Sequence, residues 1–356
     1  MATGTGKTWV AAALIARALN AGWRVLFLAH REELLDQATR TVLTVAPGAS
    51  LGIVKGERDE WGAQLVLASV QSLTPARIAR MPRFHLVVTD EAHHSPAPSY
   101  QRVYTTILRE YAHAKHGGFT ATPYQTAPAG KTRSIVGSTF DTLAFEYGLR
   151  QAMDDGWLVP ELRSLRVPTG CTIAGRSNGD FSQRGLDSAG RNEVMVGAYR
   201  HFFPAYPSAL AFAATVAHAK QLALLFRQVG VPAQAVWGNM DDELGEGARA
   251  QSLASHREGR VRMLTTVAVL TEGVDLPHTS VLLMGRPTLS LVLFMQMLGR
   301  GTRPAPGKSM LGILDFTDNV SSRLDLAPAG LADIADGVRE QAGPYELFRV
   351  CARAAA

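Results

Sequence analysis

Short, fully apolar runs alternate with amphipathic segments along the first half of the chain. The apolar runs are VLFLA (25–29), LVLAS (65–69) and HLVVTD (85–90). The first two are separated by REELLDQATRTVL, in which apolar residues recur at helical spacing. Because the runs are apolar throughout, they indicate strands that are buried on both faces, as in a parallel sheet. Strands that alternate with helices predict an α/β fold, in which crossover helices connect parallel strands.

The second half repeats this alternation. A strand is predicted at ALAFAA (209–214), followed by a helix, AHAKQLALLFRQVG, that ends at Gly230, and by a strand at AQAVWG. Three more strands are predicted at RMLTT (262–266), SVLLM (280–284) and LGILDF (311–316). The stretch between the halves is rich in Gly, Ser, Thr and Pro and has no strong periodicity, which favours a domain boundary. We predict an N-terminal domain at 1–165, a linker at 166–190, a second domain at 191–325 and a helical tail at 326–356.

Composition is that of an ordinary globular protein with a basic balance. The 356 residues are 46% hydrophobic and 7% aromatic, and the formal net charge is +5. Scattered positive charge permits nucleic-acid binding but does not identify it. Cys171 and Cys351 lie far apart without metal-ligand spacing, which argues against a disulfide framework or a zinc site and favours a cytoplasmic location. No apolar run approaches the roughly 18 residues of a membrane span, so we expect no membrane partner.

The first ten residues, MATGTGKTWV, contain a phosphate-binding pattern. They fit the Gly-x-Gly-Lys-Thr half of a Walker A segment, although Met1 stands where the full pattern has a glycine. Glycines let the backbone curl so that N–H groups face phosphate oxygens, the lysine brings a charge to the β- and γ-phosphates, and the threonine hydroxyl can bind Mg²⁺. The Ala/Leu-rich run that follows predicts a helix whose N-terminus attracts anions; a turn that only caps this helix is the alternative. The predicted ATP-binding residues are Thr3, Gly4, Thr5, Gly6, Lys7 and Thr8, with Thr8 also a metal ligand.

A pair of carboxylates ends the third apolar run. Asp90 and Glu91 follow HLVVT directly, and the carboxyl ends of strands form the ligand edge of an open parallel sheet. Asp90 can hold Mg²⁺, while Glu91 can orient and deprotonate an attacking water. A solvated acidic turn at the start of a helix is the alternative. Downstream of a phosphate loop, the catalytic interpretation is favoured.

Taken together, these motifs resemble those of the superfamily 2 helicases and translocases. ATGTGKT resembles motif I, DEAH (90–93) resembles motif II and TATP (120–123) resembles motif III. The resemblance implies that His93, Thr120 and Thr122 couple the nucleotide state to domain movement. A plain turn is the alternative for TATP, because Thr and Pro are common in turns.

Two further segments of the first half resemble motifs that touch the nucleic-acid backbone in this family. AHREELLDQ (29–37) resembles motif Ia and SVQSL (69–73) resembles motif Ib. The resemblance implies that Arg31, Ser69 and Gln71 contact phosphates without reading bases. For motif Ia, a capping box at the start of a solvated helix is the alternative.

The segment QMLGRGTRP (296–304) resembles motif VI of the same family. The resemblance implies catalytic roles for Gln296, Arg300 and Arg303. We expect the two arginines to lie on one face of a helix and to act as arginine fingers toward the γ-phosphate. A basic, solvated helix face is the alternative.

The segment TTVAVLTEGVDLP (265–277) resembles motif V. The resemblance implies that Gly273 and Asp275 line the nucleotide and that Thr265 approaches the nucleic acid. Val267 departs from the family pattern, because many relatives have Asp or Asn there.

Two connecting segments, FEYGLRQAMDDGWLVPELR (145–163) and GDFSQRGL (179–186), are similar to those of one bacterial subgroup. It contains RadD-like DNA-repair helicases and is related to the motor subunits of type I and type III restriction enzymes. The resemblance implies two tandem RecA-like domains, each a parallel sheet flanked by helices, with ATP and Mg²⁺ in the cleft between them. It also implies DNA rather than RNA as the nucleic acid, and partner subunits of a repair or restriction complex. The cysteine cluster expected of RadD-like proteins after motif VI is missing from the sequence.

The predicted function is that of an ATP-dependent helicase or translocase, which hydrolyses ATP to move along a strand. One alternative is a nucleic-acid-stimulated ATPase motor of a restriction or repair complex that does not separate strands. The other is a catalytically inert, nucleic-acid-binding remnant. The last interpretation arises because the family has a strand before motif I, whereas this sequence starts at the loop. On that basis we expect a sheet without its first strand and weak ATP binding.

Overall fold

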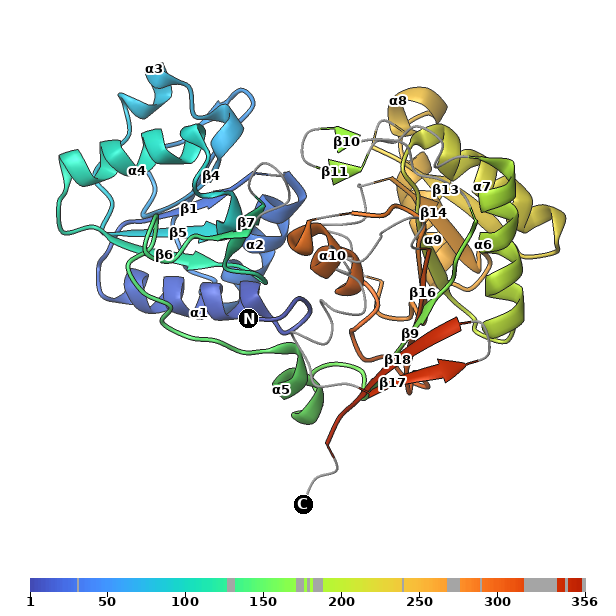
Figure 1. The fold of residues 1–356 in the computed structure, drawn as a ribbon. Helices are drawn as coiled ribbons and strands as arrows, with labels where there is room; N and C mark the ends of the chain where they lie inside the picture. Colours follow the sequence, from blue (N-terminus) through green and yellow to red (C-terminus); the bar gives the residue numbers. More distant parts are fainter. Residues whose placement is uncertain are drawn as a thin grey trace. The chain divides into compact units, whose positions relative to one another are not determined.

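The computed structural model divides the chain into two compact α/β units (Figure 1). The first holds residues 5–125 and 132–146 together with Met1, and the second holds residues 2–4 and the chain from Tyr147 onward. The structure describes the chain except for residues 31, 127–131, 171–175, 178–179, 182–187, 239, 268–275, 289, 317–337, 343–344 and 354–356. Among the helices described, none is long and apolar enough to cross a membrane.

The first unit is built on a parallel sheet. Its elements are α1 (Lys7–Asn20), β1 (Val25–Ala29), α2 (Glu32–Val45), β2 (Leu51–Lys55), β3 (Arg58–Asp59), β4 (Leu65–Ser69), the 3₁₀ helix η1 (Val70–Ser72), α3 (Pro75–Ile78), β5 (Leu86–Asp90), the 3₁₀ helix η2 (Ala92–His94), α4 (Pro98–Glu110) and β6 (Lys115–Phe119), followed by a small pair, β7 (Tyr124–Thr126) and β8 (Thr132–Ser134). The six-stranded sheet has the order β3-β2-β4-β1-β5-β6, and only β3 runs antiparallel to its neighbour. The three apolar runs predicted as strands form β4, β1 and β5 side by side.

Both faces of this sheet are covered, which explains why its central strands are apolar throughout. On one face, Phe27 of β1 packs with Ile15 of α1 and Leu35 of α2. On the other face, Leu26 and Leu28 join the core under α4. Every residue of β1, β4 and β5 is buried. The carboxyl ends of β4 and β5 are therefore held firmly at one edge of the sheet, where the predicted motifs begin.

The second unit is built on a larger sheet of eight strands. Its elements are α5 (Leu149–Asp154), β9 (Glu161–Arg166), the hairpin strands β10 (Arg176–Ser177) and β11 (Asp180–Phe181), α6 (Ala189–Phe202), β12 (Ala209–Phe212), α7 (Val216–Gln228), β13 (Ala233–Val236), α8 (Met240–Leu244), α9 (Ala248–Arg257), β14 (Met263–Thr266), β15 (Val281–Met284), α10 (Leu291–Leu298), β16 (Leu311–Asp315), β17 (Val338–Ala342) and β18 (Tyr345–Cys351). The sheet has the order β13-β14-β12-β15-β16-β9-β18-β17. The strands from β13 to β9 are parallel, and β18 and β17 are antiparallel additions at one end.

The boundary between the units lies earlier than the predicted linker at 166–190. The segment that contains α5 and β9 belongs to the second unit, although the sequence analysis placed it in the first domain. The reason is sheet pairing, since β9 pairs in parallel with β16 from Leu162 to Arg166. The glycine-rich composition therefore does not mark the start of the second unit.

The predicted helical tail is wrong wherever the structure describes that part of the chain. Residues 338–342 and 345–351 are strands. β18 pairs with β9 along its length, from Glu346 opposite Arg166 to Cys351 opposite Glu161. A neighbouring strand satisfies the open N–H and C=O groups at the edge of β9, and this pairing outweighs the local composition.

Candidate nucleotide and nucleic-acid site

The predicted phosphate loop leads into α1 as a turn, and residues 1–6 form no strand. Gly6 is the N-cap residue of α1 with a φ of 82°, and Gly4 has a φ of 91°. Both lie in the left-handed region that favours glycine. No side chain caps the helix, and its first turn contains no acidic residue. Because backbone N–H groups converge at such a terminus, the start of α1 is suited to an anion.

The acidic pair stands at the carboxyl end of β5, as predicted. Asp90 is the last residue of the strand and is 7% exposed. Glu91 follows with a φ of 47°, and it is the one non-glycine residue with a positive φ in the described ranges. Its backbone N–H donates to Asp90 Oδ1 at 2.9 Å. A glutamate in this conformation carries backbone strain, and such strain is concentrated at functional sites.

Side-chain contacts connect the DEAH segment to the TATP segment. His93 is 5% exposed, and its Nδ1 lies 3.3 Å from Glu91 Oε2 and 3.1 Å from Thr120 Oγ1. The Thr120 hydroxyl donates to the carbonyl of Thr122 at 2.9 Å and accepts from the Thr122 N–H at 3.2 Å. The structure thus brings together the acidic pair and all three predicted coupling residues. We call the series Glu91, His93, Thr120 and Thr122 the coupling chain.

Electrostatics keep Glu91 ionised. Burial raises the pKa of this carboxyl, but the contact with His93 and the charges of Lys7, His93 and His94 outweigh burial and lower the pKa to about 2. The charge of Lys7 is therefore felt at Glu91, which relates the phosphate loop to the acidic pair within the first unit. At neutral pH the carboxylate is an acceptor only.

The residues of this region fit ATP and Mg²⁺. His93 Nε2 and Thr122 Oγ1 are buried without a hydrogen-bond partner, and a ligand is one explanation for such atoms. The uncapped start of α1 suits phosphate groups, and hydroxyl and carboxylate oxygens suit Mg²⁺. Lys7, Thr8 and Asp90 are the residues that would hold the nucleotide and the ion.

The two motif VI arginines lie in a turn rather than on a helix, so that prediction is wrong. α10 ends at Leu298, and the next N–H groups, of Arg300 and Gly301, donate to carbonyls three residues back, at 3.1 and 3.0 Å. A Cβ at Gly301 would lie 2.4 Å from the side chain of Leu311, so the turn sits tightly against β16. Arg300 is 7% exposed and Arg303 is partly exposed. We call residues 299–303 the arginine turn.

The remaining predicted residues have mixed outcomes. Gln296 lies on α10 and is 7% exposed, while Ser69 ends β4 and is largely buried. Gln71 is exposed in η1. Thr265 is fully buried in β14, its hydroxyl donates to the Ala219 carbonyl at 2.7 Å, and its approach to nucleic acid stays a prediction. Thr3 and Gly4 belong to the second compact unit. Arg31, Gly273 and Asp275 lie outside the described residues.

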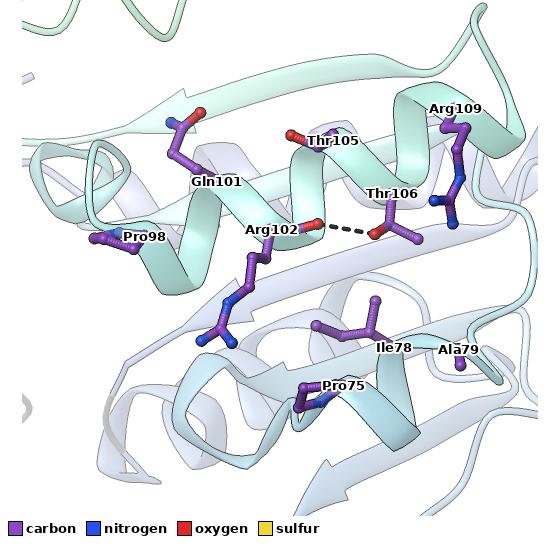
Figure 2. Close-up of a pocket in the computed structure, with 9 residues that line it drawn as sticks. All are labelled: Pro75, Ile78, Ala79, Pro98, Gln101, Arg102, Thr105, Thr106 and Arg109. Carbon is purple, nitrogen blue, oxygen red and sulfur yellow. Dashed lines mark hydrogen bonds between the residues drawn. The ribbon is translucent and has the colours of Figure 1, made fainter.

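A groove in the first unit was not indicated by any motif. It has a volume of about 530 Å³ and lies between α3 and α4 (Figure 2). Its polar side chains come from α4, including Arg102 and Arg109, and its lining contains no carboxylate. Neither the phosphate loop nor the acidic pair lines this groove, so it is separate from the candidate nucleotide site. The sequence signal that could have indicated it is a pair of arginines seven residues apart on an amphipathic helix.

Comparisons with known proteins agree with the motifs. Residues 1–125 match the family described as type III restriction enzyme, res subunit, and residues 205–305 match the helicase conserved C-terminal domain. IRC3 of Saccharomyces cerevisiae, named as an ATP-dependent helicase, is 28% identical over 361 residues, which cover 95% of this chain and 50% of IRC3. The protein irc3 of Schizosaccharomyces pombe, named as mitochondrial, is 30% identical over 348 residues, covering 93% of this chain and 56% of irc3. The structure of LlaBIII, an ATP-dependent type ISP restriction-modification enzyme bound to DNA, aligns with a TM-score of 0.62 at 19% identity, over 92% of this chain and 27% of that chain.

The matches of residues 1–125, of residues 205–305 and of IRC3 support a superfamily 2 helicase core related to the motor subunits of restriction enzymes. The predicted fold of two RecA-like units, each a sheet flanked by helices, is confirmed. The chain spans about half the length of the curated relatives it matches. The narrower likeness to RadD-like helicases and the cytoplasmic location stay predictions.

Proposed function

We propose that this protein is an ATP-dependent motor that moves along DNA. The observation that carries the proposal is the coupling chain, which joins the acidic end of β5 to the TATP segment in the unit that also contains Lys7 and Thr8. A solvated acidic turn would have no need of a buried histidine that contacts both segments. The proposal therefore favours an active site over the alternative of a capped helix and a plain turn.

The residues of the first unit divide the chemistry among them. When bound, ATP would supply the phosphoryl group and Mg²⁺ would offset its charge. Lys7 and Thr8 would hold them from the start of α1, and Asp90 would hold the ion. Glu91 would orient the attacking water and accept its proton.

The arginine turn belongs to the second unit and would serve the same reaction. Arg300 and Arg303 would donate to the charge that develops on the transferred phosphoryl group. Gln296, which precedes the turn on α10, would assist them. Because this charge develops mainly in the transition state, the arginines should affect turnover more than ATP affinity.

Nucleic-acid contact would come from the ends of the central strands in the first unit. Ser69 and Gln71 stand at and just beyond the end of β4, and Arg31 follows β1 in the sequence. Donors of this kind hold phosphates without reading bases. Affinity for two unrelated single strands should therefore fall steeply with salt and differ little between sequences. A flat salt series, or a strong preference for one sequence, would contradict backbone contact.

DNA is proposed rather than RNA because LlaBIII, which shares the fold, was solved with DNA. The decisive experiment measures ATP-driven displacement of a third strand from a DNA triplex, beside displacement of one strand from a DNA duplex. Activity on the triplex alone supports a motor that does not separate strands, which the match to the restriction-enzyme family favours. Activity on both supports a helicase. No ATP-dependent displacement from either substrate would overturn the proposal, and parallel RNA duplexes test the choice of nucleic acid.

Partner subunits remain part of the proposal. The description of the matched family names a subunit, and the relatives are about twice as long as this chain. Further segments or chains would then couple the motor to repair or restriction.

A further inference from the structure

One partly buried lysine of the second unit holds the backbone of the arginine turn through hydrogen bonds. Lys308 lies just beyond the turn, after Gly307, whose φ of 76° reverses the chain. Its Nζ donates to the carbonyl of Gly301 at 2.5 Å and to the carbonyl of Arg303 at 2.8 Å. A third bond, of 2.9 Å, reaches the carbonyl of Pro277. These three bonds hold the middle and the end of the arginine turn, at Gly301 and Arg303, and the segment that precedes β15.

The geometry matches the chemistry of an ammonium group. A lysine has three N–H donors, and each of them has a backbone carbonyl partner here. The Lys308 backbone N–H also donates to the Ala305 carbonyl at 3.0 Å, which closes the loop that returns the side chain to the turn. A Cβ at Gly301 would lie 2.4 Å from the side chain of Leu311, so the turn is held by close packing against β16 as well as by the ammonium.

This arrangement has an energetic cost that a surface lysine would not have. Burial, together with the smaller effect of the Arg303 charge, lowers the pKa of Lys308 to about 7. The three partners are neutral carbonyls, and Arg303 is the charged group that faces the ammonium. A cation held beside another cation is retained where its hydrogen bonds fix a particular conformation.

We propose that Lys308 is a positioning residue for Arg303, which fixes the backbone of the arginine turn at the Arg303 carbonyl so that this guanidinium group is aimed at its anion. The proposal rests on the catalytic role of the arginines proposed above. Lys308 itself does not touch the reacting atoms. A loosened turn would leave Arg303 present but misdirected, and small misplacements of catalytic groups are costly.

The test is a double-mutant cycle with ATP turnover and KM measured on the full chain. Lys308→Met should lower kcat by about 10- to 100-fold and change the KM for ATP by less than about threefold. Lys308→Arg, which keeps a charged multiple donor, should recover part of the loss. In an Arg303→Ala background, Lys308→Met should have less than about a twofold further effect, because the group it positions is already gone. Lys220→Met, at an exposed lysine of the same unit, is the matched control.

The outcomes separate this inference from the proposed function. If Arg303→Ala lowers kcat and folded Lys308→Met does not, only the role of Lys308 is wrong. If the two losses multiply in the double variant, Lys308 acts independently of Arg303, and positioning is again wrong. If Arg303→Ala leaves kcat unchanged, the arginine assignment fails and this inference fails with it. Should Lys308→Met not fold by circular dichroism, Lys308→Gln, which keeps an amide donor, takes its place in the same cycle.

Discussion

The acidic end of β5 and the arginine turn are held by different kinds of contact. Glu91 is held through side chains, since His93 contacts it and the Thr120 hydroxyl connects that histidine to the TATP segment. The arginine turn is held through its backbone, by carbonyl bonds to Lys308 and by close packing at Gly301. A series of side-chain contacts can rearrange when the bound ligand changes. A backbone that is held by hydrogen bonds and close packing keeps one conformation before the ligand binds. We infer that the first region senses the nucleotide state and the second supplies a rigid pair of donors.

The largest loss of ATP turnover should come from a substitution at the acidic end of β5. Glu91→Gln keeps the shape and removes the base, so ATP should still bind while turnover falls by about two to four orders of magnitude. Turnover and binding of a fluorescent ATP analogue are measured on the same samples. Glu110→Gln, at an exposed carboxylate at the end of α4, is the control. Turnover of Glu91→Gln within a few-fold of the parent would mean that another group activates water.

The arginine turn should give the next largest effect. Arg300→Ala or Arg303→Ala should lower kcat by about 100-fold or more with little change in ATP affinity, because these donors act on the transition state. Arg260→Ala, at an exposed arginine paired with Glu258, is the control. Equal losses of ATP affinity and turnover would indicate that the arginines bind the ground state of ATP instead.

Breaking the coupling chain should cost less, and should act on stimulation rather than on basal chemistry. Thr120→Val removes the hydroxyl that joins His93 to Thr122. We expect basal turnover within about threefold of the parent and stimulation by single-stranded DNA reduced by about tenfold, since this bond contributes to coupling rather than to the reacting atoms. Thr106→Val removes a hydroxyl that only donates to the Arg102 carbonyl on α4 (Figure 2) and is the matched control. Unchanged stimulation in Thr120→Val would show that coupling runs elsewhere.

A separate effect should be on stability, and acid should reveal it in the first unit. His116 Nε2 lies 3.0 Å from Thr89 Oγ1, and burial lowers the pKa of His116 from 6.5 to about 4. The folded pKa is depressed, so this stability is fully present above pH 6.5. As the pH falls below that value, the unfolded chain takes up the proton first. The free energy of unfolding should decrease by about 3 kcal/mol between pH 6.5 and 4.

Urea titrations of the parent and His116→Gln at pH 7 and pH 4.5 measure this difference. The parent should lose more stability than the variant, whereas the exposed His113→Gln should behave like the parent. Glu91 adds a loss of the same sign at lower pH, between 4.5 and about 2, because its folded pKa is also depressed. Equal losses in His116→Gln and the parent would contradict the assigned role of His116.

The buried strands were predictable because burial on both faces leaves a continuous apolar run. β1 and β4 begin and end at the predicted residues. β18 was missed because its partner, β9, lies far away in sequence and its own pattern is mixed. Sheet pairing between segments so far apart in sequence leaves no local signal. The pairing of β9 with β16, which is of this kind, explains why the unit boundary lies ahead of the glycine-rich stretch.

The site was predictable where a motif specifies the residue and its place on a strand end, as at Asp90. The left-handed backbone of Glu91 was not predictable, since it depends on what surrounds the end of β5. The three-residue spacing of the arginines wrongly predicted a helix at Arg303. The chain forms a turn there instead, which packs closely against its neighbours at Gly301. Lys308 was missed because it lies outside every motif, and only its contacts reveal it.

We propose that one ATP site in this chain drives, and responds to, contact with DNA. The most direct measurement is the rate of phosphate release from ATP as single-stranded DNA is added, with Lys7→Ala as the reference for a disabled phosphate loop. We expect the rate of the parent to rise at least several-fold and to saturate with DNA, and the Lys7→Ala rate to stay at background, because the loop lysine meets the phosphates. A rate that does not change with DNA, or one that survives Lys7→Ala, would contradict the account.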